Sequence, residues 1–266
     1  MLQNLGISFL ISALVAGAAY WRGSLSRSGA AAALLVGTLT FGFGGWIWGV
    51  ILGIFFVSSS LLSHYKETEK AQAAEKFDKG HRRDHGQVLA NGGLGSLIAL
   101  LSYIIPHPAW FVMFIGVMAT VTADTWATEL GTLSKRAPRL ISSGKQVEVG
   151  TSGGVSWLGT LVSLLGGAAI GLTAGLLSPT VEPSLGFVIG ALSGLAGSLL
   201  DSLMGATYQQ IYFCDTCQKE TESKIHKGRH QTRSLRGWAW LNNDMVNLIS
   251  SFVGGVLAVL IWQILS

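Results

Sequence analysis

The residues best suited to chemistry are carboxylates near the ends of strongly apolar segments. Asp124 lies late in one such segment, Asp201 lies late in another, and Asp244 opens a third. A carboxylate near a helix C-terminus meets the negative end of the helix dipole, and burying it in an apolar bundle costs more. A divalent cation would offset both costs, and Mg²⁺ prefers carboxylate oxygens and bridges to phosphates. The sequence therefore predicts a Mg²⁺ site at Asp124 and Asp201, with Asp244 as a third candidate ligand, and structural hydrogen bonds or salt bridges are the alternative.

Small polar residues begin three of the apolar segments. The first of these openings is Asn91-Gly92-Gly93, the second is Thr151-Ser152-Gly153-Gly154, and the third is Asn242-Asn243-Asp244. Helix N-termini expose N–H groups and a partial positive charge, and glycine lets a ligand approach the backbone. The three openings therefore predict a phosphate cradle, whereas ordinary N-capping would explain each of them singly.

Two polar loops carry arginine and lysine beside these openings. Arg82 and Arg83 precede Asn91, and Lys135 and Arg139 precede Thr151. Arginine binds phosphate in a bidentate manner, so both loops are candidates for substrate phosphate binding. The same charges could instead serve only to orient the chain in a membrane.

A later loop contains two cysteines and two histidines with metal-ligand spacing. The pattern is Cys214-x₂-Cys217-x₈-His226-x₃-His230, with a gap shorter than that of the usual zinc finger. Four such ligands would form a closed structural zinc site that braces the loop. Free thiols and two loop histidines are the alternative interpretation.

The elements that position these residues are apolar helices. Of 266 residues, 49% are hydrophobic and 12% are charged, against roughly 25% charged in an ordinary soluble domain. Apolar runs of membrane-spanning length predict about eight helices in one integral membrane domain covering residues 1–266. The predicted spans are 4–21, 28–45, 46–63, 88–105, 109–131, 154–177, 184–205 and 244–264. The fold class is therefore an all-α polytopic bundle.

The positive charges give the bundle an expected orientation. All 18 Lys and Arg residues follow the first, third, fifth or seventh span, so eight spans place every one on the same side. The positive-inside rule makes that side cytoplasmic, with both termini outside the cell membrane. The predicted cytoplasmic loops are 64–87, 132–153 and 206–241. The net charge of +4 is thereby explained without a nucleic-acid partner.

Helical periodicity separates the carboxylates. Asp201 continues a stripe of small residues that contains Gly194, Gly197 and Ser198, so it should face a closely packed helix. Glu129 lies about 140° around the helix from Asp124, which points it toward a different partner.

Four blocks in order resemble the phytyl-phosphate kinase family of integral membrane proteins. The blocks are Ala123-Asp-Thr-Trp-Ala-Thr-Glu-Leu-Gly131, Gly150-Thr-Ser-Gly-Gly-Val-Ser156, Gly197-Ser-Leu-Leu-Asp-Ser-Leu-Met-Gly-Ala206 and Asn242-Asn-Asp-Met-Val-Asn247.

The resemblance implies a kinase that converts an isoprenoid or polyprenyl monophosphate to the diphosphate, with CTP rather than ATP expected as the donor because related kinases often prefer it. It also implies that the functional positions are Asp124, Glu129, Asp201, Asn243, Asp244 and Asn247.

Two rival functions fit the same residues. A CTP-dependent cytidylyltransferase acting on a lipid phosphate would need the same carboxylates and anion sites. A transporter or flippase of phosphorylated lipid would instead need polar groups on both faces, whereas Glu182 is the only charge expected outside. No G-x-x-x-x-G-K-[S/T] sequence is present, so a nucleotide site would use another design.

Overall fold

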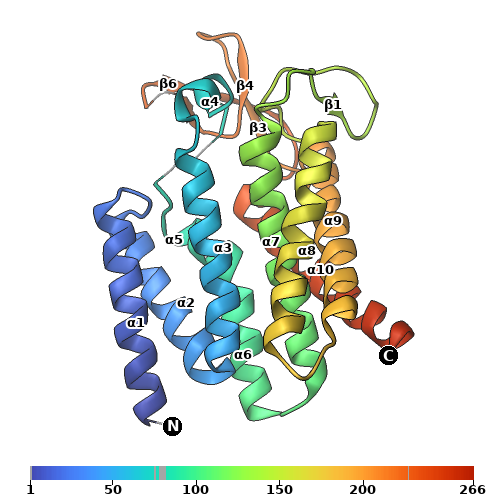
Figure 1. The fold of residues 1–266 in the computed structure, drawn as a ribbon. Helices are drawn as coiled ribbons and strands as arrows, with labels where there is room; N and C mark the ends of the chain where they lie inside the picture. The colour runs from blue at the N-terminus through green and yellow to red at the C-terminus, as the bar shows by residue number, and fades with distance from the viewer. Residues whose placement is uncertain (1, 75, 78–81, 227) are drawn as a thin grey trace.

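A computed structural model describes residues 2–74, 76–77, 82–226 and 228–266, and Figure 1 shows its fold. Long apolar helices dominate this part of the chain, with one short polar helix, α4 (Glu67–Ala74), between the third and fourth of them. The long helices are α1 (Leu2–Trp21), α2 (Arg27–Gly44), α3 (Trp46–His64), α6 (Leu94–Ile104), α7 (Pro108–Gly131), α8 (Trp157–Leu177), α9 (Pro183–Thr207) and α10 (Asn243–Leu265). The short helix α5 (His85–Val88) and the π-helical turn η1 (Leu89–Gly93) lead directly into α6.

The predicted eight spans correspond one for one to apolar helical segments. Within the described residues, six are long and apolar enough to cross a membrane, and Leu5–Trp21 forms a shorter apolar helix. The eighth segment, α2, contains Thr38, Thr40 and several glycines, which lower its hydropathy. The all-α membrane bundle is therefore confirmed.

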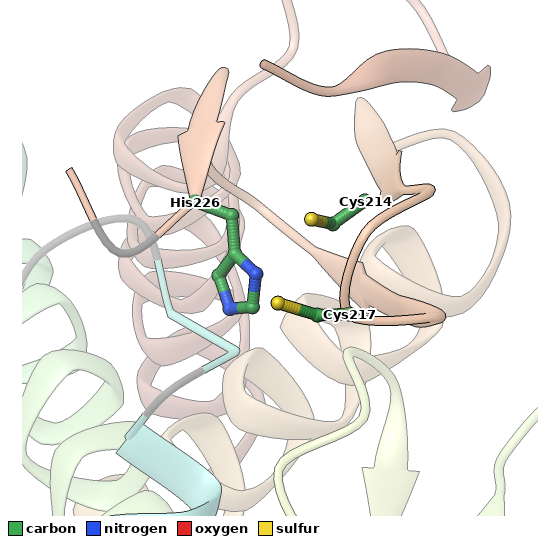
Figure 2. Close-up of side chains that lie close together, drawn as sticks. All are labelled: Cys214, Cys217 and His226. Carbon is green, nitrogen blue, oxygen red and sulfur yellow. The ribbon is translucent and has the colours of Figure 1, made fainter. Parts of the chain in front are cut away.

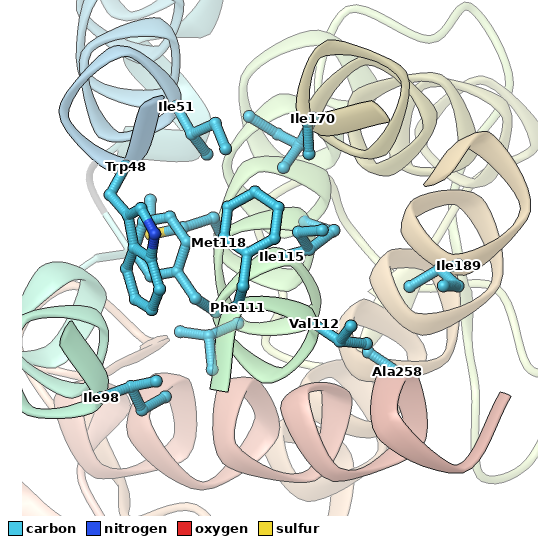
Figure 3. Packing of buried hydrophobic residues seen from close by; sticks show 14 of the residues in the cluster. Trp48, Ile51, Ile98, Phe111, Val112, Ile115, Met118, Ile170, Ile189 and Ala258 are labelled. Carbon is cyan, nitrogen blue, oxygen red and sulfur yellow. The ribbon is translucent and has the colours of Figure 1, made fainter. Parts of the chain in front are cut away.

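Helix α7 forms the centre of the bundle. Its buried residues are Phe111, Val112 and the run from Phe114 to Ala123, and α3, α6, α8, α9 and α10 all pack against it. Figure 3 shows Ile115 and Met118 of α7 among side chains from the surrounding helices. On one side Trp48 of α3 stacks on Phe114, with ring centroids 4.3 Å apart. Because α7 is enclosed, its polar residues face other helices rather than lipid.

Glycines set how closely α7 meets α9 and α10. A Cβ atom added at Gly197 of α9 or at Gly254 of α10 would overlap the side chain of Thr120 on α7. Close approach of backbones at small residues is how helices associate in a membrane. The small-residue stripe predicted on the seventh span is buried against its neighbours, as expected.

The loops contain short strands, which were not predicted from the sequence. They form three antiparallel sheets: β1 with β2, β3 between β4 and β7, and β5 with β6. The strands are β1 (Arg139–Leu140), β2 (Gly154–Val155), β3 (Ile211–Cys214), β4 (Lys219–Thr221), β5 (Ile225–His226), β6 (His230–Gln231) and β7 (Arg233–Arg236). Figure 1 places α4 and these strands at one end of the bundle, with both chain termini away from it.

The alternating helix directions bring the basic connections together. The turns after α1, α3, α7 and α9 lie at the strand-bearing end of the bundle (Figure 1). Lys79 and Lys227, which belong to the same predicted set of charges, fall outside the described residues. Which side of the membrane this end faces stays a prediction.

Gly254→Ala should destabilise the bundle because the new methyl group would press on Thr120 and force α10 away from α7. Overpacking of this kind costs about 1–3 kcal/mol. The thermal midpoint in detergent measures the effect. Gly53→Ala on α3 is the matched control, since nothing lies within 4 Å of a Cβ there. Equal midpoints for the two variants would contradict the close-packing account.

Candidate functional site

A polar cavity of about 730 Å³ lies among the ends of the long helices and the loops above them. Helices α7, α9 and α10 contribute acidic and amide side chains, and all three predicted Mg²⁺ ligands line it. The predicted site residues found in its lining are Arg83, Asn91, Asp124, Glu129, Thr151, Ser152, Gly153, Gly154, Asp201, Asn243, Asp244 and Asn247. The fold thus brings residues as far apart in the sequence as Arg83 and Asn247 to the same cavity.

The two aspartates in the middle of the bundle are held by hydroxyl groups from neighbouring helices. Ser198 of α9 donates to Asp124 Oδ1 on α7 at 3.4 Å, and Ser250 of α10 donates to Asp201 Oδ2 on α9 at 3.1 Å. Neither aspartate has a Lys, Arg or His within 4.0 Å among the described residues. Of the alternative interpretation, the described part of the chain thus shows the structural hydrogen bonds for this pair and not the salt bridges. The remaining oxygens can accept a cation or a ligand donor.

Glu129 is engaged differently from the two aspartates. Its carboxylate accepts from Ser63 Oγ at 2.8 Å and forms an ion pair with Lys70, whose side chain is only 5% exposed. Lys70 also donates to the carbonyl oxygens of Leu62 at 2.7 Å and Ser63 at 3.1 Å, and so satisfies the C-terminal end of α3. As predicted from its position about 140° around the helix from Asp124, Glu129 thus has different partners, Lys70 and Ser63. Glu129 lines the cavity, but its contacts here are those of a helix-joining ion pair.

Arg83 brings a positive charge to the cavity wall. Its guanidinium reaches only the hydroxyls of Ser60 at 3.4 Å and Ser63 at 3.5 Å, and no described carboxylate lies within ion-pair distance. Burial lowers the pKa of Arg83, while the nearby charge of Glu129 acts in the opposite direction. Arginine stays protonated despite such shifts. A half-buried cation whose contacts in the described residues are long ones to hydroxyls suits an anionic ligand.

The backbone fixes Arg83 firmly in place. Its N–H donates to Ser24 O at 3.0 Å and its carbonyl accepts from Ser26 N–H at 2.9 Å, which ties it to the α1–α2 turn. Its position therefore does not depend on a ligand.

Two of the three predicted helix N-termini are wrong, because the helices begin at other residues. The fourth span begins at His85, where Asp84 already caps it in a capping box, so Asn91 lies on the π-helical turn inside that span. The sixth span begins at Trp157 with Ser156 as its cap. Short polar residues form turns as readily as they form caps, which explains both errors. Only α10 begins as predicted, with Asn242 accepting from Met245 N–H at 3.0 Å.

The segment Thr151–Gly154 forms a tight turn on the cavity wall. Gly153 has a φ of +82° and lies so close to Ala206 that a Cβ there would be 2.5 Å from the Ala206 Cβ. Ser152 Oγ donates to Gln209 at 2.9 Å. Gly153 thus lets this loop meet the end of α9, which is a packing reason for its presence.

Several predicted residues lie outside the cavity lining. Arg82 donates to Leu25 O at 3.0 Å and stacks on the Tyr20 ring. Gly92 packs against Val36, and Gly93 follows it as the last residue of the π-helical turn η1. Lys135 and Arg139 are exposed, with Arg139 donating to Gly144 O at 2.7 Å.

Other cavity residues were missed by sequence reasoning. The 206–241 loop supplies Gln210, Tyr212, Glu222 and Lys224. Short strands fold this loop back over the helix ends, and two- to four-residue strands leave too little periodicity to recognise. Lys70 was taken for a topology charge because nothing in its local sequence marks its long-range partner, Glu129.

Of the four predicted zinc ligands, three come together. Ligand atoms of Cys214, Cys217 and His226 all lie within 4.8 Å of one another, outside the cavity lining. His230 is not in this group; its Nε2 accepts from Arg229 Nε at 3.2 Å.

The fold and this site define a polytopic integral membrane protein with a polar, acidic cavity at one end of its bundle. Residues 10–255 match the family described as "Integral membrane protein DUF92", and the chain belongs to this family. No solved structure matches the chain.

Curated relatives span plants and archaea. Protein PGR of Arabidopsis thaliana is 34% identical over 95% of this chain and 96% of its own length. An uncharacterised membrane protein of Methanocaldococcus jannaschii is 33% identical over 90% of this chain and 86% of its own. Protein VTE6, chloroplastic, of Arabidopsis thaliana is 30% identical over 90% of this chain and 66% of its own. The family and these relatives fit the resemblance to isoprenoid-phosphate kinases drawn from the motifs.

Glu129→Gln should destabilise the protein strongly because it leaves the buried ammonium of Lys70 without its counter-charge. Breaking a buried ion pair from one side costs about 3–5 kcal/mol. Unfolding by denaturant or heat in detergent measures the loss. Glu69→Gln is the matched control, since its pair with Lys66 is about half exposed and is worth under about 1 kcal/mol. A Glu129→Gln protein as stable as Glu69→Gln would contradict the assigned structural role.

Proposed function

We propose that this protein is a membrane phosphotransferase that moves a phosphoryl group from a nucleoside triphosphate, preferentially CTP, to an isoprenoid monophosphate. The observation that carries the proposal is the cavity itself, where Asp124, Asp201 and Asp244 share one space with the half-buried cation of Arg83. Phosphoryl transfer needs little covalent chemistry from the protein; it needs anionic groups held in line and their charge neutralised. The cavity offers groups for each task.

The location of the cavity suits a lipid phosphate. Its lining combines residues of the apolar helices α7, α9 and α10 with residues of the polar loops that join them. A prenyl tail would lie among the helices with its phosphate in the cavity, and the nucleotide would enter from the side of the loops. We infer that this side faces the cytoplasm and that the protein lies in the cell membrane, because the basic connections lie at the same end of the bundle.

Arg83, Asn243 and Asn247 are the side chains suited to bind phosphate oxygens. Arginine donates from a planar fork that matches a phosphate, and the two amides lie on the first turns of α10, where the helix dipole favours an anion. Asn91 and the Thr151–Gly154 turn face the same space. An attacking phosphate oxygen is already ionised, so no strong general base is required of the chain.

Asp124 and Asp201 are suited to a magnesium ion by their chemistry, although within the described residues the group of three ligand atoms that lies within 4.8 Å is Cys214, Cys217 and His226 rather than the three aspartates. Hard carboxylate oxygens are its preferred protein ligands, and Asp124 and Asp201 each receive only one serine hydroxyl from the described chain. Asp124 and Asp201, with Asp244 as a third candidate, would hold it. When bound, Mg²⁺ would neutralise the donor phosphates and the charge that develops during transfer. Ser198 and Ser250 would keep the two carboxylates turned toward the cavity.

Asp201→Asn should abolish turnover while leaving the protein folded. Removing a group that stabilises transition-state charge costs roughly 10²–10³-fold in kcat. The assay combines purified protein, Mg²⁺, labelled CTP or ATP and a panel of prenyl monophosphates. Asp215→Asn is the matched control, because Asp215 pairs with Arg233 on the exposed loop. Full activity of Asp201→Asn would remove the metal argument, and no transfer by folded wild-type protein to any acceptor that it binds would refute the kinase.

The products of the same assay separate the two transferases that this cavity could support. Release of CDP with formation of a prenyl diphosphate identifies the kinase. Release of pyrophosphate with formation of a CDP-lipid identifies a cytidylyltransferase and would overturn the reaction type proposed here.

A further inference from the structure

A second cluster of reactive side chains lies away from the cavity, in the 206–241 loop. Cys214 ends β3, Cys217 lies in the turn that follows, and His226 ends β5. Their ligand atoms lie within 4.8 Å of one another. Figure 2 shows both sulfur atoms directed toward the imidazole ring of His226.

The turn between the cysteines has a fixed shape. Gln218 N–H donates to Cys214 O at 2.8 Å, and Gln218 adopts a φ of +53°, which a residue other than glycine rarely takes. This hairpin turn joins β3 to β4 and places Cys214 and Cys217 side by side. No disulfide joins Cys214 and Cys217. Two thiols and a ring nitrogen are thus presented to one point by backbone that is already in place.

Burial distinguishes this cluster from a chance surface grouping. Cys214 is fully buried and His226 is 2% exposed, while Cys217 is half-buried. Thiolate and imidazole ligands in a tetrahedral arrangement select zinc. We propose that Cys214, Cys217 and His226 bind a zinc ion that joins the two small sheets of this loop.

His230 is outside the set, which sharpens the four-ligand prediction made from spacing. It lies opposite His226 in the β5–β6 pair, but its ring accepts from Arg229. Among described residues the chain therefore supplies three ligands, and the fourth position of a tetrahedral ion goes to water or another donor.

The ion would act as a brace. The pair β5–β6 has only two residues in each strand, and an isolated hairpin of that size is not stable in water. A zinc ion would link its His226 to the β3–β4 turn of the larger sheet. Tyr212 on β3 and Lys224 and Ile225 beside His226 all line the cavity, so the brace would hold one wall of the proposed active site.

Metal analysis of purified protein, prepared with reductant and without chelator, tests the proposal. The expected result is one zinc per chain for wild type and for His230→Ala, and loss of zinc in Cys217→Ser and His226→Ala. Cys217 is the first choice for substitution because it is only half-buried, and size-exclusion behaviour shows whether each variant is folded. Chelator should lower the thermal midpoint of wild type but leave that of Cys217→Ser unchanged.

Cobalt provides an independent readout, because Co²⁺ bound by thiolate gives charge-transfer bands that Cys217→Ser should weaken. Wild type that neither contains nor takes up zinc would overturn the proposal, as would full zinc content in Cys217→Ser. Loss of zinc from His230→Ala would overturn the three-ligand assignment. None of these outcomes depends on transferase activity, so the zinc site is tested independently of the proposed function.

Discussion

The close contact of α7, α9 and α10 is the constraint on which the rest of the structure depends. Gly197 and Gly254 let the backbones approach around Thr120, and the same approach brings Ser198 to Asp124 and Ser250 to Asp201. A carboxylate inside an apolar bundle is expensive, and a hydroxyl offsets only part of that cost. Two such carboxylates line one cavity, and the Mg²⁺ that we propose there would remove the remaining cost.

The loops close over this cavity through a few long-range bonds. Lys76 pairs with Glu148 at 2.8 Å and donates to Thr151, and its carbonyl accepts from Thr221 and Glu222. Arg236 donates to Gly205 O at 3.0 Å at the end of α9. Three segments far apart in sequence are thereby joined above the helix ends. The proposed zinc would add rigidity to the segment with the shortest strands.

Features that depend on the composition of a whole segment could be predicted from the sequence. Features that depend on a single contact between distant residues could not. Apolar length and the position of the charges predicted the eight helical segments, and the small-residue stripe predicted that Asp201 faces a neighbouring helix. Asn91 and Thr151 were misplaced because a small polar residue beside glycine signals a turn, a cap or a π-helical turn alike. Lys70 was missed because its partner, Glu129, is distant in sequence, and the strands of the 206–241 loop were missed because strands of two to four residues show too little periodicity.

The most direct test of the central claim is equilibrium binding of labelled CTP to the purified protein with and without Mg²⁺. The account predicts that Mg²⁺ increases CTP affinity in wild type, that Asp124→Asn removes this increase, and that Arg83→Gln weakens binding under both conditions. CTP binding that is independent of Mg²⁺ and equal in wild type, Asp124→Asn and Arg83→Gln would contradict it. That result would mean that the nucleotide does not occupy the cavity lined by these residues.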